Sequence, residues 1–126
     1  MKLFSIEEAN AVLPVVRRVV LTIQREHLRL QSFQAAAREA AEAAERGGGG
    51  GMRGGGVYVR TLVKMAAQTS ELESIGVQIK DYARGLIDFP SLRDGRIVLL
   101  CWQLGEGERI EWWHDVEAGF AGRQPL

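Results

Sequence analysis

The hydrophobic period of this 126-residue chain changes at Gly76. Before that residue, apolar side chains recur every three or four positions, a spacing typical of amphipathic helices. After it, apolar and polar residues alternate, as in residues 77–80 and 96–104, a pattern typical of half-buried strands. We therefore expect an α+β fold, with a long antiparallel helical hairpin over residues 5–75 and a small antiparallel β-meander with its tail over residues 77–126. The length fits a single domain, residues 1–126.

The first helix of the hairpin has a clear start signal. Ser5-Ile6-Glu7-Glu8 has the S-x-x-E form of a capping box, so the helix is predicted to begin at about residue 6. Pro14 cannot donate a backbone hydrogen bond, and we expect a short helix over residues 6–12 and then a kink or restart at the proline. The apolar seam that follows is bulky in its first half and alanine-rich in its second. Its positions are Leu13, Val16, Val20, Ile23, His27, Leu30, Gln34, Ala37, Ala41 and Ala44.

A glycine-rich stretch separates the two predicted helices. Residues 47–56 contain eight glycines, which lose much conformational entropy when ordered, so we expect a flexible linker there. A second helix is predicted over residues 57–75, with an apolar face formed by Val59, Leu62, Val63, Ala66, Thr69 and Leu72. Because the first helix is much longer, its segment Ala35 to Ala44 overhangs the second. We expect a homo-oligomer, a dimer, in which helices 14–46 and 57–75 of two chains share a bundle.

Glycines and a proline divide the second half of the chain. A turn is predicted over residues 90–95, which contain Asp-Gly, and a second hairpin connection over residues 105–108. The last strand is predicted over residues 109–114. The remaining residues, 115–126, are expected to form an irregular segment laid across the sheet.

Charge and composition restrict the partners and the location. The chain carries 16 basic and 16 acidic residues, so no net field draws it to nucleic acid or to an anionic membrane. The arginine-rich stretch from Arg17 to Arg29 lacks the interleaved aromatic residues of a nucleic-acid surface. No apolar stretch has the length of a membrane span or a signal segment, and Cys101 is the only cysteine, so we expect a cytoplasmic protein without disulfides. No cofactor fingerprint is present, and no cofactor is expected.

Candidate catalytic residues lie in the meander. A turn centred between Glu106 and Gly107 sets Cys101 opposite Trp112 and Leu99 opposite His114, so the thiol and the imidazole lie diagonally on one face. With Asp88 they are candidates for nucleophilic chemistry. However, a free cysteine in so apolar a strand more often serves as a small buried hydrophobe. A metal ion is not expected. The alternative ligand set is His114, Asp115 and Glu117, whose spacing matches no metal motif.

The two adjacent tryptophans suggest a binding surface. Alternation sends Trp112 and Trp113 to opposite faces, so one faces the helices and the other faces solvent, the tail or a partner. The candidate binding residues are Arg84, Asp88, Trp113, His114 and Arg123, an aromatic anchor with a charged rim. We therefore expect a non-catalytic, homo-oligomeric binding or interaction protein that uses the sheet face and the C-terminal segment. The alternative is a small enzyme or metal-dependent ligand-binding protein with a site built from Asp88, Cys101, His114 and Asp115.

Several short motifs occur in an order that is shared with a known family. They are Arg84-Gly85-Leu86-Ile87-Asp88-Phe89-Pro90, Leu100-Cys101-Trp102, Gly105-Glu106, Trp113-His114 and Gly119-Phe120-Ala121-Gly122-Arg123, with Glu7-Glu8-Ala9-Asn10 and Leu13-Pro14 in the first helix. In these motifs the chain resembles the uncharacterised bacterial proteins grouped as domain of unknown function 2203. The resemblance implies a bacterial protein. It implies no activity, and no catalytic residues are carried over from it.

Overall fold

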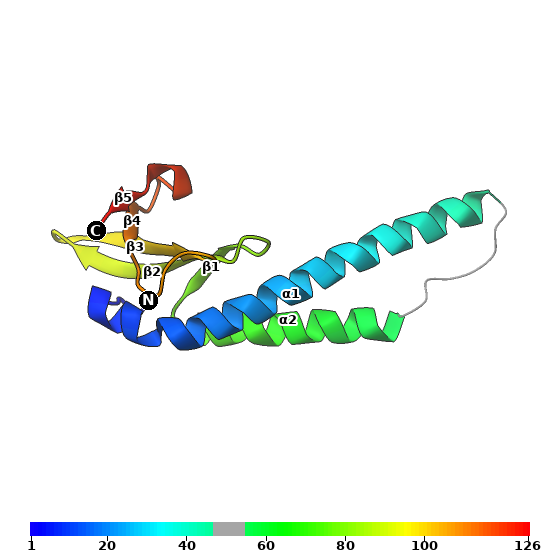
Figure 1. Ribbon diagram of the computed structural model, residues 1–126, viewed down its shortest axis with the longest axis horizontal. Coiled ribbons are helices and arrows are strands. Elements are labelled where there is room, and N and C mark those ends of the chain that lie inside the picture. Colours follow the sequence, from blue (N-terminus) through cyan, green and yellow to red (C-terminus); the bar gives the residue numbers. More distant parts are fainter. Residues whose placement is uncertain (47–54) are drawn as a thin grey trace.

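Two helices and a five-stranded sheet make up the fold (Figure 1). The computed structural model describes residues 1–46 and 55–126. Helix α1 spans Ile6–Glu45 and helix α2 spans Gly55–Ile75. The strands are β1 (Gln78–Asp81), β2 (Leu86–Arg93), β3 (Arg96–Gln103), β4 (Trp112–Asp115) and β5 (Gln124–Pro125), with a 3₁₀ turn, η1 (Phe120–Gly122), before the last. Successive strands pair antiparallel, which confirms the predicted helical hairpin and meander.

Helix α1 is one helix that runs through Pro14, so the prediction of a separate short helix over residues 6–12 was wrong. The capping box forms as predicted: the Glu8 amide donates to Ser5 Oγ, and the Ser5 amide donates to Glu8 Oε1, both at 3.0 Å. Leu13 and Val16 are buried on either side of the proline, and this packing holds the helix together across one missing backbone hydrogen bond. The first turns are inclined to the rest of α1 in Figure 1, as expected for a proline kink.

The two helices are unequal. Helix α1 has 40 residues and α2 has 21, so they measure about 60 Å and about 32 Å at the standard helical rise. Figure 1 shows the far end of α1 running past the start of α2 and diverging from it, which is the predicted overhang. The predicted linker, residues 47–56, falls mostly outside the described residues, but Gly55 and Gly56 belong to the first turn of α2. Within the described residues, neither helix has a stretch that is both long and apolar enough to cross a membrane.

Helix α2 buries only one end of its predicted apolar face, at Leu72. The side that meets α1 carries Thr61 and Leu72, both buried, and Tyr58, which packs edge-on against Phe33 of α1 with 5.8 Å between ring centroids. The buried Thr61 hydroxyl donates to the Val57 carbonyl at 2.8 Å, which satisfies its hydrogen-bonding need inside the helix. The helix interface is therefore partly polar.

The part of the predicted apolar face that lies nearer the start of α2 points outward instead. Val59, Leu62 and Val63 are 57%, 42% and 64% exposed, so the prediction that these three residues are buried was wrong. Hydrophobic periodicity identifies an apolar stripe on a helix, but it does not identify the surface that covers the stripe. We call this open stripe the α2 strip; its residues are Val59, Leu62, Val63 and Ala66.

The sheet presents one face to α1 and the other to the C-terminal segment (Figure 1). Alternation along β3 sends Leu100 and Trp102 to the helix side, and Leu99 and Cys101 to the tail side. The helix-side face and the first half of α1 form the apolar core. Its fully buried large side chains include Phe4, Leu13, Ile23, Leu72, Ile87, Phe89, Leu100 and Trp102.

Pro90 lies inside β2, opposite Leu99, although the sequence predicted a turn from residue 90 onward. The turn is confined to Asp94 and Gly95, which adopt φ values of 50° and 78°. Pro90 is tolerated because the pairing of β2 with β1 stops at Asp88, and the segment before α1 covers the edge of β2 beyond that point. The Phe4 amide donates to the Pro90 carbonyl at 2.7 Å, and the Ser91 hydroxyl donates to the Phe4 carbonyl at 2.6 Å.

The C-terminal segment is more regular than predicted, because η1 and β5 form within it. Strand β5 pairs with β4, and the Leu126 amide donates to the Glu111 carbonyl at 2.9 Å. Strand β4 begins at Trp112 rather than at residue 109. The Ile110 amide before it donates to Asn10 Oδ1 at 2.7 Å, so the end of the β3–β4 connection is tied to α1.

Candidate functional site

Three polar side chains meet under the C-terminal segment on the tail side of the sheet. Asp88 of β2 pairs with Cys101 of β3, and Cys101 pairs in turn with Trp112 of β4. Leu99 pairs with His114, so the register predicted for β3 and β4 is the one observed. Because the register places them side by side, one ligating atom from each of Asp88, Cys101 and His114 lies within 4.8 Å of the other two. We call these three residues the Asp–Cys–His cluster.

The imidazole of His114 contacts an oxygen at each of its nitrogens. His114 Nε2 lies 3.1 Å from Asp88 Oδ1, and both side chains are only 3% exposed. His114 Nδ1 lies 2.8 Å from the backbone carbonyl oxygen of Asp115. A carbonyl oxygen can only accept, so Nδ1 carries the proton of that bond. A neutral ring then has only a lone pair at Nε2, so the contact with the carboxylate requires a second proton or a cation between the two atoms.

The thiol of Cys101 is buried against the same carboxylate. Burial, together with the negative charge of Asp88, raises the pKa of Cys101 from its ordinary value of 9.0 to about 12. The thiol is therefore protonated near neutral pH. Since the thiolate is the nucleophile in cysteine chemistry, this environment disfavours an activated cysteine.

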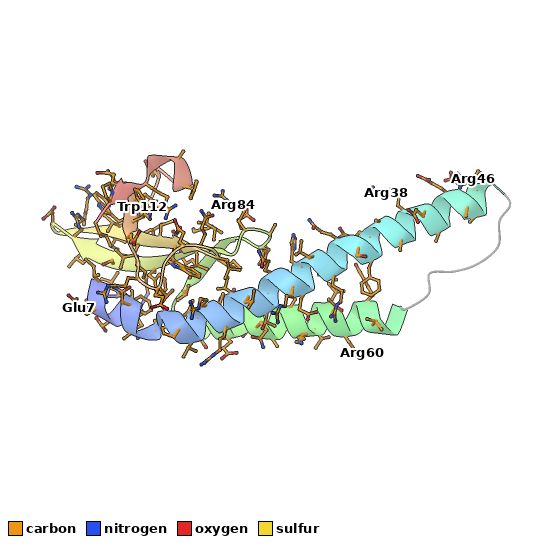
Figure 2. The ribbon with its side chains drawn as sticks, in the orientation of Figure 1. Glu7, Arg38, Arg46, Arg60, Arg84 and Trp112 are labelled. Carbon is orange, nitrogen blue, oxygen red and sulfur yellow. The ribbon has the colours of Figure 1, made fainter. Side chains whose placement is uncertain are left out.

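Trp113 does not lie on the tail side with the other predicted binding residues. It is 6% exposed and packs in the core on the helix side, where the Arg93 guanidinium lies 4.6 Å from its ring centroid. Trp112 takes the tail-side position instead, because adjacent residues of a strand face opposite ways. Figure 2 shows Trp112 and Arg84 at the sheet end of the molecule, far from the overhang that carries Arg38 and Arg46.

Two predicted arginines hold the C-terminal segment. The Arg123 guanidinium donates to both carboxylate oxygens of Glu106 at 2.8 and 2.7 Å, and it lies 4.9 Å from the ring centroid of Trp112. The Phe120 ring is contacted by Arg123 at 4.7 Å and by Arg84 at 4.1 Å. These cation–π contacts and the paired hydrogen bonds fix the segment over the sheet. Sequence reasoning did not assign Glu106 or Phe120 to the site, because only the folded tail brings them to it.

The alternative metal-ligand set is not assembled. Asp115 Oδ1 accepts from Arg96 Nε at 3.0 Å, in a pair whose side chains are both about half exposed. Glu117 is exposed. Of the three residues in that set, only His114 has its side chain in the Asp–Cys–His cluster.

A cavity of about 150 Å³ adjoins the Asp–Cys–His cluster, and we call it the tail-side cavity. Asp88 and His114 supply its buried polar groups. Gly119 borders it with φ 65° and ψ −168°, a conformation essentially restricted to glycine, and so directs the chain over the opening. The other lining residues are Lys80, Leu86, Leu99, Val116 and Phe120.

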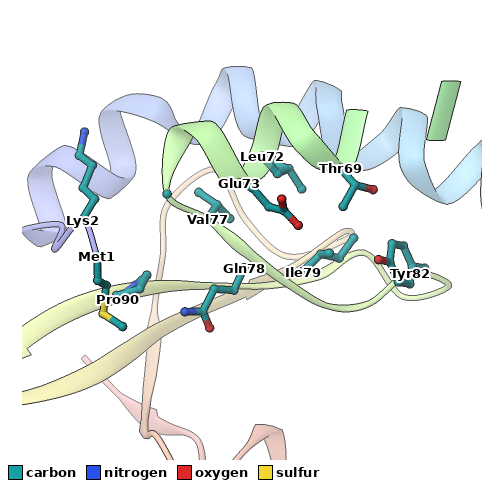
Figure 3. A pocket seen from close by; sticks show the side chains of 11 residues that line it. Met1, Lys2, Thr69, Leu72, Glu73, Val77, Gln78, Ile79, Tyr82 and Pro90 are labelled. Atoms are coloured by element: carbon teal, nitrogen blue, oxygen red, sulfur yellow. The ribbon is translucent and has the colours of Figure 1, made fainter. Parts of the chain in front are cut away.

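A larger cavity, of about 480 Å³, lies where the N-terminal segment meets the end of α2 and the start of β1 (Figure 3). Figure 3 shows Thr69, Leu72 and Glu73 reaching from α2 toward the strand that carries Gln78 and Ile79. This larger cavity contains none of the predicted site residues. It shares Thr69, Glu73 and Tyr82 with a second depression of about 370 Å³ that runs along α2 to Leu62. Together they form a groove along α2, bordered by Leu30 of α1 and by Tyr82, which we call the α2 groove.

The comparisons with known proteins give one match. A family model described as Uncharacterized conserved protein (DUF2203) matches residues 2–126, almost the whole chain. No curated protein and no solved structure matches the chain. The description of the family names no activity, so a function has to be inferred from the residues themselves.

Proposed function

The chain belongs to the DUF2203 family of uncharacterized conserved proteins, and from that premise we propose that it binds a small molecule in the tail-side cavity and does so as a homo-oligomer. The ligand-binding part of the proposal rests on one observation. Asp88 and His114 lie together under a C-terminal segment that Arg123 fixes in place. A pocket with apolar walls and a few buried polar groups is the usual form of a ligand site. Arg84 and Arg123 contribute indirectly, by positioning Phe120 at the wall of the cavity.

The dimensions and lining of the cavity define a class of ligand. An apolar protein cavity of about 150 Å³ accommodates benzene. Leu86, Leu99, Val116 and Phe120 suit a flat apolar body of that size. The Asp88–His114 pair suits a polar group on one edge of that body, and Lys80 adds a positive charge to the lining. The ligand class is therefore a small ring compound with one hydrogen-bonding or charged substituent.

Binding fits this site better than thiol catalysis. The raised pKa of Cys101 keeps the sulfur protonated near neutral pH, and the side chain is only 1% exposed. An attacking cysteine needs both thiolate character and access. The buried thiol also supports a reducing, cytoplasmic location, and the family resemblance supports a bacterial source.

Titration with three ring compounds tests the binding proposal. Phenol, benzoate and 4-methylimidazole represent neutral, anionic and cationic ligands of the right size. Two-dimensional amide NMR of the full chain should show saturable shifts at Val116, Gly119 and Phe120 with at least one of them. Val116 is 56% exposed, so V116W should fold and fill the cavity mouth, and should abolish the shifts. V15W, at an exposed valine on α1, is the matched control. If none of the three compounds gives saturable shifts at these amides, the cavity is not a ligand site.

The second part of the proposal is a homodimer that buries the α2 groove. The occupant we propose is the α1 overhang of a second copy. The α2 strip and the groove beside it are apolar at Leu30, Leu62, Met65 and Ala66. The overhang is unpaired by α2 and alanine-rich, and small side chains allow a helix to approach a groove closely. One chain thus has both an apolar groove and a helix end that fits it.

Sedimentation velocity across a range of concentrations tests the dimer. The parent chain should sediment as a dimer, and A37E/A41E/A44E should shift it to monomer, because three carboxylates on one helix face cannot be buried in an apolar groove. L62E should do the same from the groove side. R38E, at an exposed overhang residue, is the control for added negative charge. A parent chain that remains monomeric at the highest concentration contradicts the dimer and leaves the ligand proposal standing.

A further inference from the structure

We propose that the Asp–Cys–His cluster binds a divalent transition-metal ion of the zinc type, with Asp88 Oδ1, Cys101 Sγ and His114 Nε2 as its three protein ligands. This site goes beyond the proposed ligand cavity. It is carried by three side chains that the sheet register brings together, and it does not require the cavity to hold an organic ligand.

The separations of the donor atoms suit such an ion. Bonds of about 2.0 Å to nitrogen and oxygen and about 2.3 Å to sulfur give tetrahedral edges of about 3.3 Å and about 3.5 Å. The Nε2 to Oδ1 distance is 3.1 Å, close to the first of these edges. The sulfur lies within 4.8 Å of the other two donors, so movements of about 1 Å close the remaining edges.

The charges of the ligands balance the ion. Asp88, Cys101 and His114 are 2%, 1% and 3% exposed, so an unbalanced charge among them is costly. A divalent cation bound by one carboxylate, one thiolate and one neutral imidazole gives a site of zero net charge. On binding, the thiol proton and any proton on Nε2 leave for solvent, and the metal takes the place of both.

The hydrogen bond at the other ring nitrogen of His114 already suits metal coordination. Its Nδ1–H donates to the Asp115 carbonyl at 2.8 Å, which fixes the tautomer that leaves Nε2 for a metal. Metal-binding histidines commonly donate their other nitrogen in this way. A metal ion between Nε2 and Asp88 Oδ1 would also account for two acceptor atoms that lie 3.1 Å apart.

The donor set decides the class of ion. Thiolate and imidazole ligands favour Zn²⁺, Co²⁺ or Cu²⁺, whereas Mg²⁺ and Ca²⁺ prefer oxygen ligands alone. Three protein ligands leave a fourth position, as in catalytic rather than closed structural zinc sites. Asp88 and His114 also line the tail-side cavity, so that position opens toward it.

Cobalt substitution tests the metal site on the untagged full chain. After treatment with a chelator, titration with Co²⁺ should give a sulfur-to-metal charge-transfer band that saturates at one ion per chain. Zn²⁺ should displace the cobalt, and Mg²⁺ and Ca²⁺ should not. C101S should abolish the band, because Cys101 is the only cysteine. D88N and H114Q should weaken Co²⁺ binding by about two orders of magnitude or more.

The other histidine of the chain provides the matched control. His27 stacks on Tyr82 at 5.8 Å, away from the cluster, and H27Q should leave the band unchanged. If a cluster variant fails to fold, X-ray absorption of the zinc-loaded parent chain decides the question, since it should show one sulfur and lighter nitrogen or oxygen neighbours. A folded parent chain that gives no charge-transfer band and retains no metal overturns the proposal, and the three residues are then a hydrogen-bonded network only. Displacement of cobalt by Mg²⁺ also overturns it.

Discussion

The two faces of the sheet are built on opposite principles. The helix-side face buries apolar groups such as Phe89, Leu100 and Trp113 against α1, and it has the dense packing of a core. The tail-side face buries a carboxylate, a thiol and an imidazole under a short segment that is held by two arginines, Arg84 and Arg123. Apolar burial stabilises the fold, whereas buried polar groups are costly unless each has a partner. The difference indicates that the helix side maintains the structure, and it is the reason that we place the proposed binding site on the tail side.

The largest effect should come from a cavity on the helix side. Phe89 is fully buried and packs edge-on against Phe4 at 5.3 Å between centroids. F89A should lower the free energy of unfolding by about 3–5 kcal/mol, measured by urea denaturation. Leu92 in the same strand is 60% exposed, and L92A should change it by less than about 0.5 kcal/mol. Equal losses in the two variants would mean that the helix-side face is not the core.

A double-mutant cycle should show that the tail-side residues are energetically coupled. D88A and H114A each leave the other partner buried without its bond, so the double variant should be less destabilised than the sum of the singles. We expect a coupling of about 1–3 kcal/mol in urea denaturation with a chelator present. Additive losses would show that the 3.1 Å contact contributes nothing.

Raising the pH should lower the stability of the protein through Cys101, which lies on the tail-side face. Its pKa is raised to about 12 in the folded chain, so between about pH 9 and 12 the unfolded chain loses a proton that the folded chain retains. Stability therefore falls as pH rises through this window, by at most about 1.4 kcal/mol per pH unit. With a chelator present, so that no metal ion holds the thiolate, urea denaturation of C101S should show a shallower decline than that of the parent. Lysines and tyrosines titrate in both proteins, so the difference isolates the thiol. Parallel declines would contradict the burial of a protonated sulfur.

The smallest effect should come from Arg123. Both bonds to Glu106 leave the single nitrogen Nη2, and a lysine ammonium could replace them. A lysine lacks the planar guanidinium that lies over Trp112 and Phe120, so R123K should loosen the tail by about 1 kcal/mol. Hydrogen exchange should then speed up at the amides of residues 119–124, while the urea midpoint stays nearly unchanged. Arg96 pairs with Asp115 at the surface, and R96K should leave the same amides unaffected. Exchange that is unchanged in R123K would show that Arg123 does not hold the segment.

Local rules were enough to predict most of the fold. The capping box at Ser5, the change of period at Gly76 and the turn between β3 and β4 each depend on residues that are close in sequence. The pairing of Leu99 with His114 followed from that turn alone, and with it the closeness of Cys101 to His114. This part of the candidate site was accessible from the sequence because antiparallel register extends a local turn over several residues.

Features that depend on distant partners could not be predicted in the same way. Pro90 continues a strand because the segment around Phe4 covers its edge, a contact between residues 86 positions apart. Alternation showed that Trp112 and Trp113 face opposite ways, but not which one faces the helices. The residues of the α2 strip were wrongly predicted to be buried for the same reason, because an apolar stripe on a helix does not show which surface covers it. Phe120 and Glu106 join the site only through the folded tail.

The continuity of α1 through Pro14 has a mechanical consequence. One rod begins against the sheet, where Asn10 is bonded to the connection between β3 and β4, and ends beyond α2. A binding partner that tilts the free end of α1 would therefore also move the start of α1, which lies beside the strand that carries His114.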